Sequence, residues 1–329
     1  MELIRERKSL IFIIAAFFPL LLSLPPAASA EGTFSRIVVF GTSLSDPGNA
    51  FAIWHEKSTP PYDTLDQFAI PDHPYAKSGL HYTNGATWIE QFSRPLGLAG
   101  SVRPAFAARG GEASNYAVGR ARAREDAGTA GFINLPAQVS AFLSDHSGTA
   151  PADALYVVEI GSNDLKDALE SFAAGRDGGA IIADALSSIG GNLERLYASG
   201  ARRFLVWNVP DIGLTPALRT LDKAAPGVAQ SATLLSAAFN ANLDMLLGYL
   251  QRLPGIEIVR LDAKRILSDL ARDPAAFGLV VADAACVTPN VPPFECREPD
   301  AYLFWDGIHP TRAVHGMIAQ NAAVGLSRR

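Results

Sequence analysis

The sequence predicts an α/β protein with three layers, α/β/α, built around a doubly wound parallel sheet. Short apolar runs alternate with stretches of helical periodicity along most of the chain, which is the pattern of successive strand–helix–strand units. The apolar runs are nearly continuous, as expected for parallel strands that are covered on both faces. Of the 329 residues, 48% are hydrophobic and 19% are charged, which indicates a globular protein with a large core.

Five segments are predicted to be strands because each is short, rich in β-branched or other apolar residues, and bounded by turn-forming residues. In chain order they cover residues 37–40, 116–118, 155–160, 204–209 and 256–261. Doubly wound sheets bind ligands beyond the carboxyl ends of their strands. The residues that directly follow these segments are therefore the first candidates for a functional site.

Helical spacing of apolar residues predicts helices between and after the strands. They cover residues 87–93, 136–143, 180–198, 228–252 and 264–271, and a last helix begins at Thr311. In the longest of these helices, one set of residues at helical spacing is expected to face the core rather than a cofactor or a partner. This set consists of Leu234, Ala238, Asn242, Met245, Tyr249 and Leu253.

The largest interruption of this pattern is residues 51–82, which contain several prolines and aromatic residues. Two interpretations are equally open: an insertion that covers the substrate, or an ordinary surface loop. There is no internal repeat and no low-complexity linker. We therefore expect one domain.

The first thirty residues differ in composition from the rest. Three basic residues precede an apolar run over residues 9–24, and Ala28-Ser29-Ala30 follows it. This order predicts a cleavable export signal over residues 1–30, with a mature domain over residues 31–329 that works in the periplasm or is secreted. A membrane anchor is the alternative, but the run is shorter than the roughly 20 residues that a bilayer requires and Pro19 interrupts it.

The charge balance restricts the class of partner. The chain has 33 acidic and 28 basic side chains, for a net charge of −5. It lacks the basic surface that neutralises phosphates, so we expect no nucleic acid partner. No obligate protein partner is indicated, and transient contact with membrane lipid remains open.

Both cysteines, Cys286 and Cys296, lie in one proline-rich stretch over residues 285–299. In an exported protein we expect them to form a disulfide, with two free thiols as the alternative. There is no CxxC pair and no HExxH motif, and the six histidines are scattered. The sequence therefore indicates no metal and no other cofactor.

Two short motifs contain the residue types of a nucleophile and its base. Ser43 follows the first predicted strand, and Asp306 and His309 stand three residues apart just before the last helix. A serine hydroxyl becomes a good nucleophile when a base takes its proton, and the base needs a partner that holds its tautomer. Taken singly, each motif is explained equally well by residues of ordinary turns and helix caps.

Acyl transfer also requires hydrogen-bond donors for the developing oxyanion. Gly119 follows the second predicted strand, and its amide can approach a ligand closely because no Cβ intervenes. Asn163 follows the third, where its side-chain NH₂ can donate. With the amide of Ser43, these groups would converge at one end of the sheet.

Four sequence blocks, taken in chain order, resemble the four ordered blocks of the GDSL, or SGNH, hydrolases. The blocks cover residues 40–49, 115–119, 161–164 and 306–309, so the resemblance extends over nearly the whole mature chain. In addition, residues 303–311 are similar to the bacterial lipase and phospholipase branch. The resemblance implies the flavodoxin-like SGNH hydrolase fold.

The resemblance also implies roles for single residues. Ser43 would be the nucleophile, His309 the general base and acid, and Asp306 the residue that orients it. The oxyanion hole would be formed by the amides of Ser43 and Gly119 and by the side chain of Asn163. No cofactor is implied.

Two positions depart from the family pattern. The first block usually has aspartate before the serine, where this chain has Thr42, so the hydrogen bonding around Ser43 is expected to differ. In the second block, Arg120 stands where a second glycine is frequent. Its side chain is expected either to be exposed to solvent or to meet a carboxylate or phosphate of the substrate.

The expected function is that of a secreted serine esterase or lipase that cleaves carboxylic esters, lipid or short to medium acyl esters, through an acyl-enzyme on Ser43. Within enzymes, the alternative is a carbohydrate O-acetylesterase, because related members of the fold deacetylate glycans. A non-catalytic binding protein on the same scaffold is the alternative from another class, and Thr42 is the reason to consider it.

Overall fold

The computed structural model describes residues 34–54, 80–107, 112–125, 131–287, 292–293 and 295–328. Residues 33–329 form one compact unit, distinct from residues 1–32. The expected export signal lies outside the described residues, and so does most of the irregular segment over residues 51–82.

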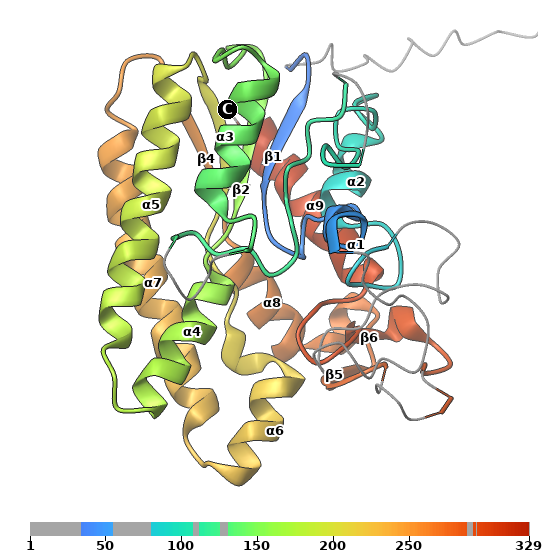
Figure 1. Cartoon of the computed structure of the whole chain (residues 1–329). Helices are drawn as coiled ribbons and strands as arrows, with labels where there is room; N and C mark the ends of the chain where they lie inside the picture. Colours follow the sequence, from blue (N-terminus) through green and yellow to red (C-terminus); the bar gives the residue numbers. More distant parts are fainter. Residues whose placement is uncertain are drawn as a thin grey trace, which may run out of the picture. The chain divides into compact units, whose positions relative to one another are not determined.

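Four parallel strands form the central sheet, in the order β1 (Ile37–Gly41), β2 (Leu155–Glu159), β3 (Arg203–Trp207), β4 (Glu257–Leu261). Nearly all of their residues are buried, which explains why their sequences are continuous apolar runs. The sheet lies between helices on both of its faces (Figure 1), so the predicted fold class is confirmed.

The predicted strand over residues 116–118 does not form a regular strand, although it runs parallel beside β1. The amides of Tyr116 and Val118 donate to carbonyls of β1. Regular pairing stops because the Gly41 amide, which would continue the ladder to the Tyr116 carbonyl, donates to Gln138 Oε1 instead. On the outer edge, Asn49 Nδ2 donates to the carbonyls of Asn115 and Ala117, and the Asn115 side chain accepts from the Ala117 amide. With this segment counted second in the chain, the spatial order is 2-1-3-4-5, which is the flavodoxin-like order with its switch point between β1 and β2.

One face of the sheet is covered by α3 (Leu135–Asp145), α5 (Gly178–Ala198) and α7 (Val228–Leu250), with α4 (Ser162–Ala173) packed against α5 and α7. Strand residues that point to this side, such as Phe40, Tyr156 and Phe204, form one apolar core with these helices. The opposite face is covered by α2 (Trp88–Ser93), α8 (Ala263–Arg272) and α9 (Arg312–Ser327) (Figure 1). The six predicted helices correspond to α2, α3, α5, α7, α8 and α9.

Several elements in the described part of the chain were not predicted. They are the helices α1 (Asn49–Trp54), α4 and α6 (Pro216–Ala224), three short 3₁₀ turns, and a separate pair of parallel strands, β5 (Val281–Ala285) and β6 (Tyr302–Phe304). For α6 a signal was present, because the Thr215 hydroxyl caps it and Pro216 occupies the first turn. Helix α4 begins at the expected turn around Asn163 and continues much further. Within the described ranges, no helix has the length and apolarity that a membrane span requires.

The prediction of the core face of α7 is wrong. Leu234, Met245 and Tyr249, which were expected to face the core, are 63%, 68% and 58% exposed. The buried face instead contains Phe239 and Leu243, together with Ala232, Leu247 and Leu250. Both faces of this helix carry large apolar residues at helical spacing, so periodicity alone does not decide which face the sheet covers.

Cys286 and Cys296 form a disulfide, with Sγ–Sγ 2.08 Å and Cα–Cα 5.0 Å. The Cys296 amide donates to the Cys286 carbonyl, and Cys286 packs against the buried Trp305. The disulfide therefore closes a loop directly beside the residue that precedes Asp306.

Candidate active site

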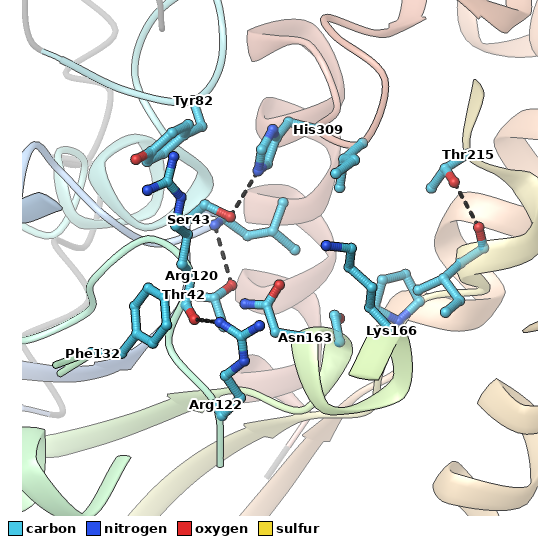
Figure 2. A pocket seen from close by; sticks show the side chains of 15 residues that line it. Thr42, Ser43, Tyr82, Arg120, Arg122, Phe132, Asn163, Lys166, Thr215 and His309 are labelled. Atoms are coloured by element: carbon cyan, nitrogen blue, oxygen red, sulfur yellow. Dashed lines mark hydrogen bonds between the residues drawn. The ribbon is translucent and has the colours of Figure 1, made fainter. Parts of the chain in front are cut away.

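Ser43, His309 and Asp306 form a continuous chain of hydrogen bonds at the carboxyl end of β1. The distance from His309 Nε2 to Ser43 Oγ is 2.7 Å (Figure 2). The distance from His309 Nδ1 to Asp306 Oδ2 is also 2.7 Å. Asp306 is fully buried and His309 nearly so, whereas Ser43 is partly exposed. The hydroxyl is therefore the member of the chain that a substrate can reach.

The loop after β6 holds Asp306 and His309 in this arrangement. Asp306 Oδ1 accepts the amides of Ile308 and His309, at 2.8 and 2.7 Å, so that the other carboxylate oxygen faces the imidazole. The Trp305 amide donates to the His309 carbonyl and closes the loop. A spacing of three residues suffices because the carboxylate binds the backbone of the histidine as well as its ring.

The turn that carries Ser43 is held from the layer of helices. Gln138 on α3 accepts from the Gly41 amide at 2.8 Å and donates to its carbonyl at 2.9 Å, at the last residue of β1. The Ser45 amide then donates to the Thr42 carbonyl across the turn. These hydrogen bonds fix the position of Ser43 at the carboxyl end of β1.

Thr42 lies against the buried carboxyl group of Glu159, the last residue of β2. Its hydroxyl is 2.9 and 3.0 Å from the two carboxyl oxygens, and its amide donates to Glu159 Oε2 at 3.1 Å. Burial raises the pKa of Glu159 to about 7, against the lowering effect of the bonds from Thr42 and Ser45. The carboxyl group next to the nucleophile turn thus comes from the neighbouring strand.

Gly119 was expected to direct its amide at the oxyanion, but in the structure this amide donates to Asp46 Oδ2 at 2.8 Å. Asp46 is fully buried and also accepts the amides of Gly48, Asn49 and Ala50 at the start of α1. Burial raises the pKa of Asp46 to about 6, although all four amides lower it. The amide of Gly119 therefore connects the segment beside β1 to α1 in this structure.

Tyr82 is a residue of the site that sequence reasoning missed. Its ring stacks on the imidazole of His309, with centroids 5.3 Å apart and an interplanar angle of 29°. A Cβ at Gly119 would lie 2.5 Å from the Tyr82 ring, so glycine is required there for close approach. No motif marked Tyr82, because only the folded chain brings it to His309.

Asn163 lies in the first turn of α4, directly after β2. Gly161 before it has φ +119°, and a Cβ there would lie 2.8 Å from Phe239 on α7. Asn163 Nδ2 donates to the Ala121 carbonyl at 2.8 Å, which holds the amide group in place. A side-chain amide has two N–H donors, and Asn163 lines the same cavity as Ser43.

A cavity of about 350 Å³ opens at Ser43 and His309. Its wall includes Leu44, Phe132 and Ile212 together with the cationic side chains of Arg120, Arg122 and Lys166. The cavity can therefore accept a partly apolar molecule that reaches the serine hydroxyl. Separately, no cluster of His, Cys, Asp or Glu side chains among the described residues could hold a metal ion.

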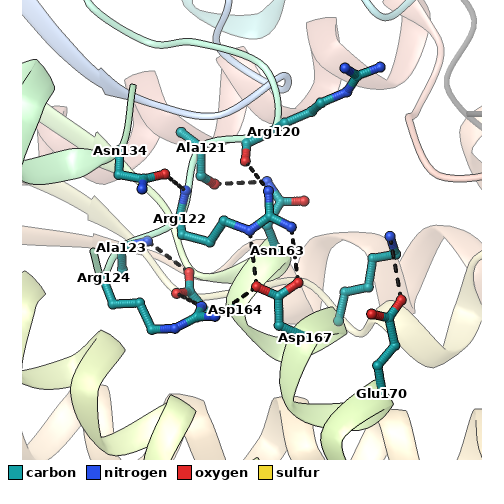
Figure 3. A network of polar contacts seen from close by, with 11 residues as sticks. Arg120, Ala121, Arg122, Ala123, Arg124, Asn134, Asn163, Asp164, Asp167 and Glu170 are labelled. Carbon is teal, nitrogen blue, oxygen red and sulfur yellow. Dashed lines mark hydrogen bonds and ion pairs between the residues drawn. The ribbon is translucent and has the colours of Figure 1, made fainter. Parts of the chain in front are cut away.

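Beneath the cavity, an ion-pair network joins the segment after Gly119 to α4 (Figure 3). Arg122 binds Asp167 through two nitrogens, at 3.0 and 2.9 Å, and Arg124 binds both Asp164 and Asp167. Burial alone would raise the pKa of Asp167, but the hydrogen bonds and charges of the two arginines outweigh it and lower that pKa. This network fixes Asn163 relative to the strand that carries Ser43.

The fold and the hydrogen-bonded chain through Ser43 point to hydrolases that use a serine. The GDSL-like Lipase/Acylhydrolase family model matches residues 37–322. A GDSL esterase/lipase of Arabidopsis thaliana is 27% identical, with 90% of this chain and 83% of the relative covered. A second GDSL esterase/lipase of that plant is 30% identical over 88% and 87% of the two chains. A phosphatidylcholine-sterol acyltransferase of Aeromonas hydrophila is 25% identical over 90% and 91%.

The chain belongs to the GDSL-like lipase/acylhydrolase family and is a carboxylic ester hydrolase. The family match begins at the first residue of β1 and ends within α9, so it includes both the Ser43 turn and the loop with Asp306 and His309.

Proposed function

We propose that this protein cleaves carboxylic esters through an acyl-enzyme on Ser43. The observation that carries the proposal is the chain from Ser43 through His309 to Asp306, with the hydroxyl at the mouth of a cavity. A positioned base within hydrogen-bond distance of the hydroxyl, itself oriented by a carboxylate, is what a serine nucleophile requires.

In the proposed reaction, Asp306 accepts a hydrogen bond from the Nδ1–H of His309 and so keeps the lone pair of Nε2 directed at Ser43. His309 takes the hydroxyl proton as Oγ attacks the ester carbonyl, and returns it to the leaving alcohol when the carbon–oxygen bond breaks. Water then attacks the acyl-enzyme by the same route, and Ser43 regains its proton. Each proton passes through one imidazole nitrogen.

We propose the Ser43 amide and the second N–H of Asn163 as donors to the oxyanion. Asn163 is supported by its fixed amide group and its place in the cavity wall. The Gly119 amide would have to leave Asp46 to contribute. Removing one donor of this kind costs about 3–4 kcal/mol of transition-state stabilisation in serine hydrolases.

Export forms part of the proposal. Residues 1–30 would be removed after Ala30, and the mature domain would act in the periplasm or outside the cell. The disulfide between Cys286 and Cys296 supports an oxidising compartment. The family resemblance around residues 303–311 favours lipid esters over acetylated carbohydrates as substrates.

The test is hydrolysis of p-nitrophenyl esters from acetate to palmitate by the mature protein and by Ser43→Ala. We expect wild-type activity to fall by a factor of at least about 10³ in the variant, because the hydroxyl is the nucleophile. Ser144→Ala, an exposed position on α3, is the matched control and should retain activity.

The chain-length optimum separates the substrate classes, since an optimum at acetate indicates an O-acetylesterase and longer optima indicate lipid cleavage. A folded wild-type protein that hydrolyses no ester and forms no adduct with a fluorophosphonate would contradict the proposal. That outcome would favour the non-catalytic binding protein.

A further inference from the structure

We propose that the cavity beside Ser43 selects esters that carry an anionic group, a carboxylate or a phosphate, and that Arg120 and Lys166 bind this group. The inference rests on the proposed function, because it names the substrate class of the same site. Three observations carry it: the charges of the cavity wall, the backbone conformation of Arg120, and the positions of Arg120 and Lys166 on opposite sides of the cavity.

The cavity wall differs in charge from the rest of the molecule. Among the described residues that line it, Arg120, Arg122 and Lys166 are cationic and none is acidic. The whole chain, by contrast, has a net charge of −5. A positively charged cavity wall in a protein of net negative charge attracts anions to this cavity rather than to the rest of the surface.

Arg120 has a backbone conformation that L-residues rarely adopt. Its φ is +66°, and Ser147 is the only other described non-glycine residue with positive φ. Arg120 is the third residue of a turn in which the Ala121 amide donates to the Val118 carbonyl, and glycine would adopt this conformation without strain. A strained residue at the edge of a site indicates a function for its side chain.

The Arg120 side chain lines the cavity on the side of Tyr82, and Lys166 enters from α4 on the other side (Figure 2). Arg122 also lines the cavity, and its guanidinium makes two bonds to Asp167. We assign the anion to Arg120 and Lys166 because these two side chains flank the cavity from opposite sides.

Lys166 has a weak intramolecular partner. Its Nζ is 3.5 Å from Glu170, and the two side chains are 48% and 61% exposed. Exposed pairs of this kind contribute little, so a substrate anion inside the cavity can compete with Glu170. The planar guanidinium of Arg120 can bind two oxygens of a carboxylate or a phosphate at once.

The apolar part of the wall provides for the rest of the ester. Leu44, Phe132 and Ile212 line the cavity together with the two cations. A molecule with a hydrocarbon acyl chain and one anionic group would satisfy both kinds of surface, with its ester carbonyl at Ser43. Glycerol phosphate esters of fatty acids and half-esters of dicarboxylic acids both have this composition.

The experiment compares matched esters that differ in one charge. The first pair is monohexanoyl glycerol and monohexanoyl glycerol 3-phosphate, with the anion on the alcohol side. The second pair is p-nitrophenyl hexanoate and mono-p-nitrophenyl adipate, with the anion on the acyl side. We expect kcat/KM to favour the anionic member of at least one pair, and the preference to decrease as salt is raised.

Arg120→Gln and Lys166→Met test the assignment. Each should lower the ratio of anionic to neutral kcat/KM by about tenfold, as expected for loss of one charge-assisted hydrogen bond. Arg176→Gln and Lys223→Met make the same charge changes at positions outside the cavity wall and should leave the ratio unchanged.

Equal kcat/KM for both members of both pairs would overturn the inference, and so would an unchanged ratio in both cavity variants. If the wild type hydrolyses none of the four esters, the esterase proposal fails by itself. Calorimetric titration of Ser43→Ala with monohexanoyl glycerol 3-phosphate then decides: binding that Arg120→Gln weakens supports the anion site, and no binding overturns it.

Discussion

The carboxyl group beside the nucleophile turn belongs to Glu159 in this protein, whereas the family's first block usually has aspartate at position 42. Thr42 donates its hydroxyl and its amide to Glu159, so the turn keeps a hydrogen-bonded carboxyl group although its own residue is neutral. The contact forms because β1 and β2 are adjacent and in register, with Gly41 opposite Glu159. The neutral residue at position 42 is thus hydrogen-bonded to a carboxyl group from the neighbouring strand.

Glu159 makes stability depend on pH. Burial raises its pKa from 4.5 to about 7, so the folded protein binds this proton more tightly than the unfolded chain does. The resulting stabilisation is complete below about pH 4.5 and is lost as pH rises to about 7. We expect the free energy of unfolding of the wild type, relative to Glu159→Gln, to fall by about 3 kcal/mol between pH 4.5 and 7.5.

Urea unfolding at a series of pH values measures this difference. Glu194→Gln, an exposed position on α5, is the control and should follow the wild type at every pH. Parallel curves for the wild type and Glu159→Gln would contradict the expectation, because they would show that folding does not shift the pKa of Glu159.

At the scale of elements, α7 shows how far helical periodicity can be interpreted. Its length and position were predicted well, yet its buried face was assigned to the wrong side. The sheet and α5 cover the face of α7 that contains Phe239 and Leu243. The face that contains Met245 remains exposed to solvent. An apolar stripe identifies a core face only where the opposite stripe is polar.

Two alanine variants distinguish the faces of α7. Leu243 is 2% exposed and Met245 is 68% exposed. We expect Leu243→Ala to lower the free energy of unfolding by about 2–5 kcal/mol, because it leaves a cavity in the core. Met245→Ala should change it by less than about 0.5 kcal/mol. Chemical denaturation of both variants measures the difference, and equal losses would contradict the observed orientation.

At the scale of the whole molecule, the site is assembled from distant segments. The two partners of the hydrogen bond between His309 and Ser43 are 266 residues apart in the sequence. Segments after β1, β2 and β6 converge on the cavity, and the ion pairs between Arg122, Arg124 and α4 hold the segment after Gly119 in place. The contacts that stabilise the domain therefore also preserve the geometry of the site.

The disulfide contributes to this stability near the site. It is the only bond that a thiol reductant can break, because the chain contains two cysteines. Closure of a loop with sequence separation 10 should stabilise the fold by about 2–3 kcal/mol. We expect the double variant Cys286→Ser/Cys296→Ser to have a free energy of unfolding lower by that amount, and so to unfold at a lower urea concentration. Reduced wild type should match the double variant. Identical midpoints for oxidised and reduced protein would contradict this expectation.

Much of the fold was predictable from local patterns. The strands over residues 37–40 and 155–160 and the helix over residues 180–198 were found because apolar continuity and helical periodicity are properties of short windows. The segment over residues 116–118 does not form the predicted regular strand, because the Gly41 amide of β1 donates to the Gln138 side chain rather than to this segment. No local pattern contains that information.

The sequence by itself determined the fold class, the family and the candidates Ser43, Asp306 and His309, because each depends on residue types at short spacing. Only the tertiary structure decided that Tyr82 stacks on His309, that Glu159 binds Thr42, and that the amide of Gly119 is directed at Asp46. These contacts join segments whose relative position depends on packing of the whole sheet between its helices. Burial, which sets the pKa of Glu159 and Asp46, likewise exists only in the folded chain.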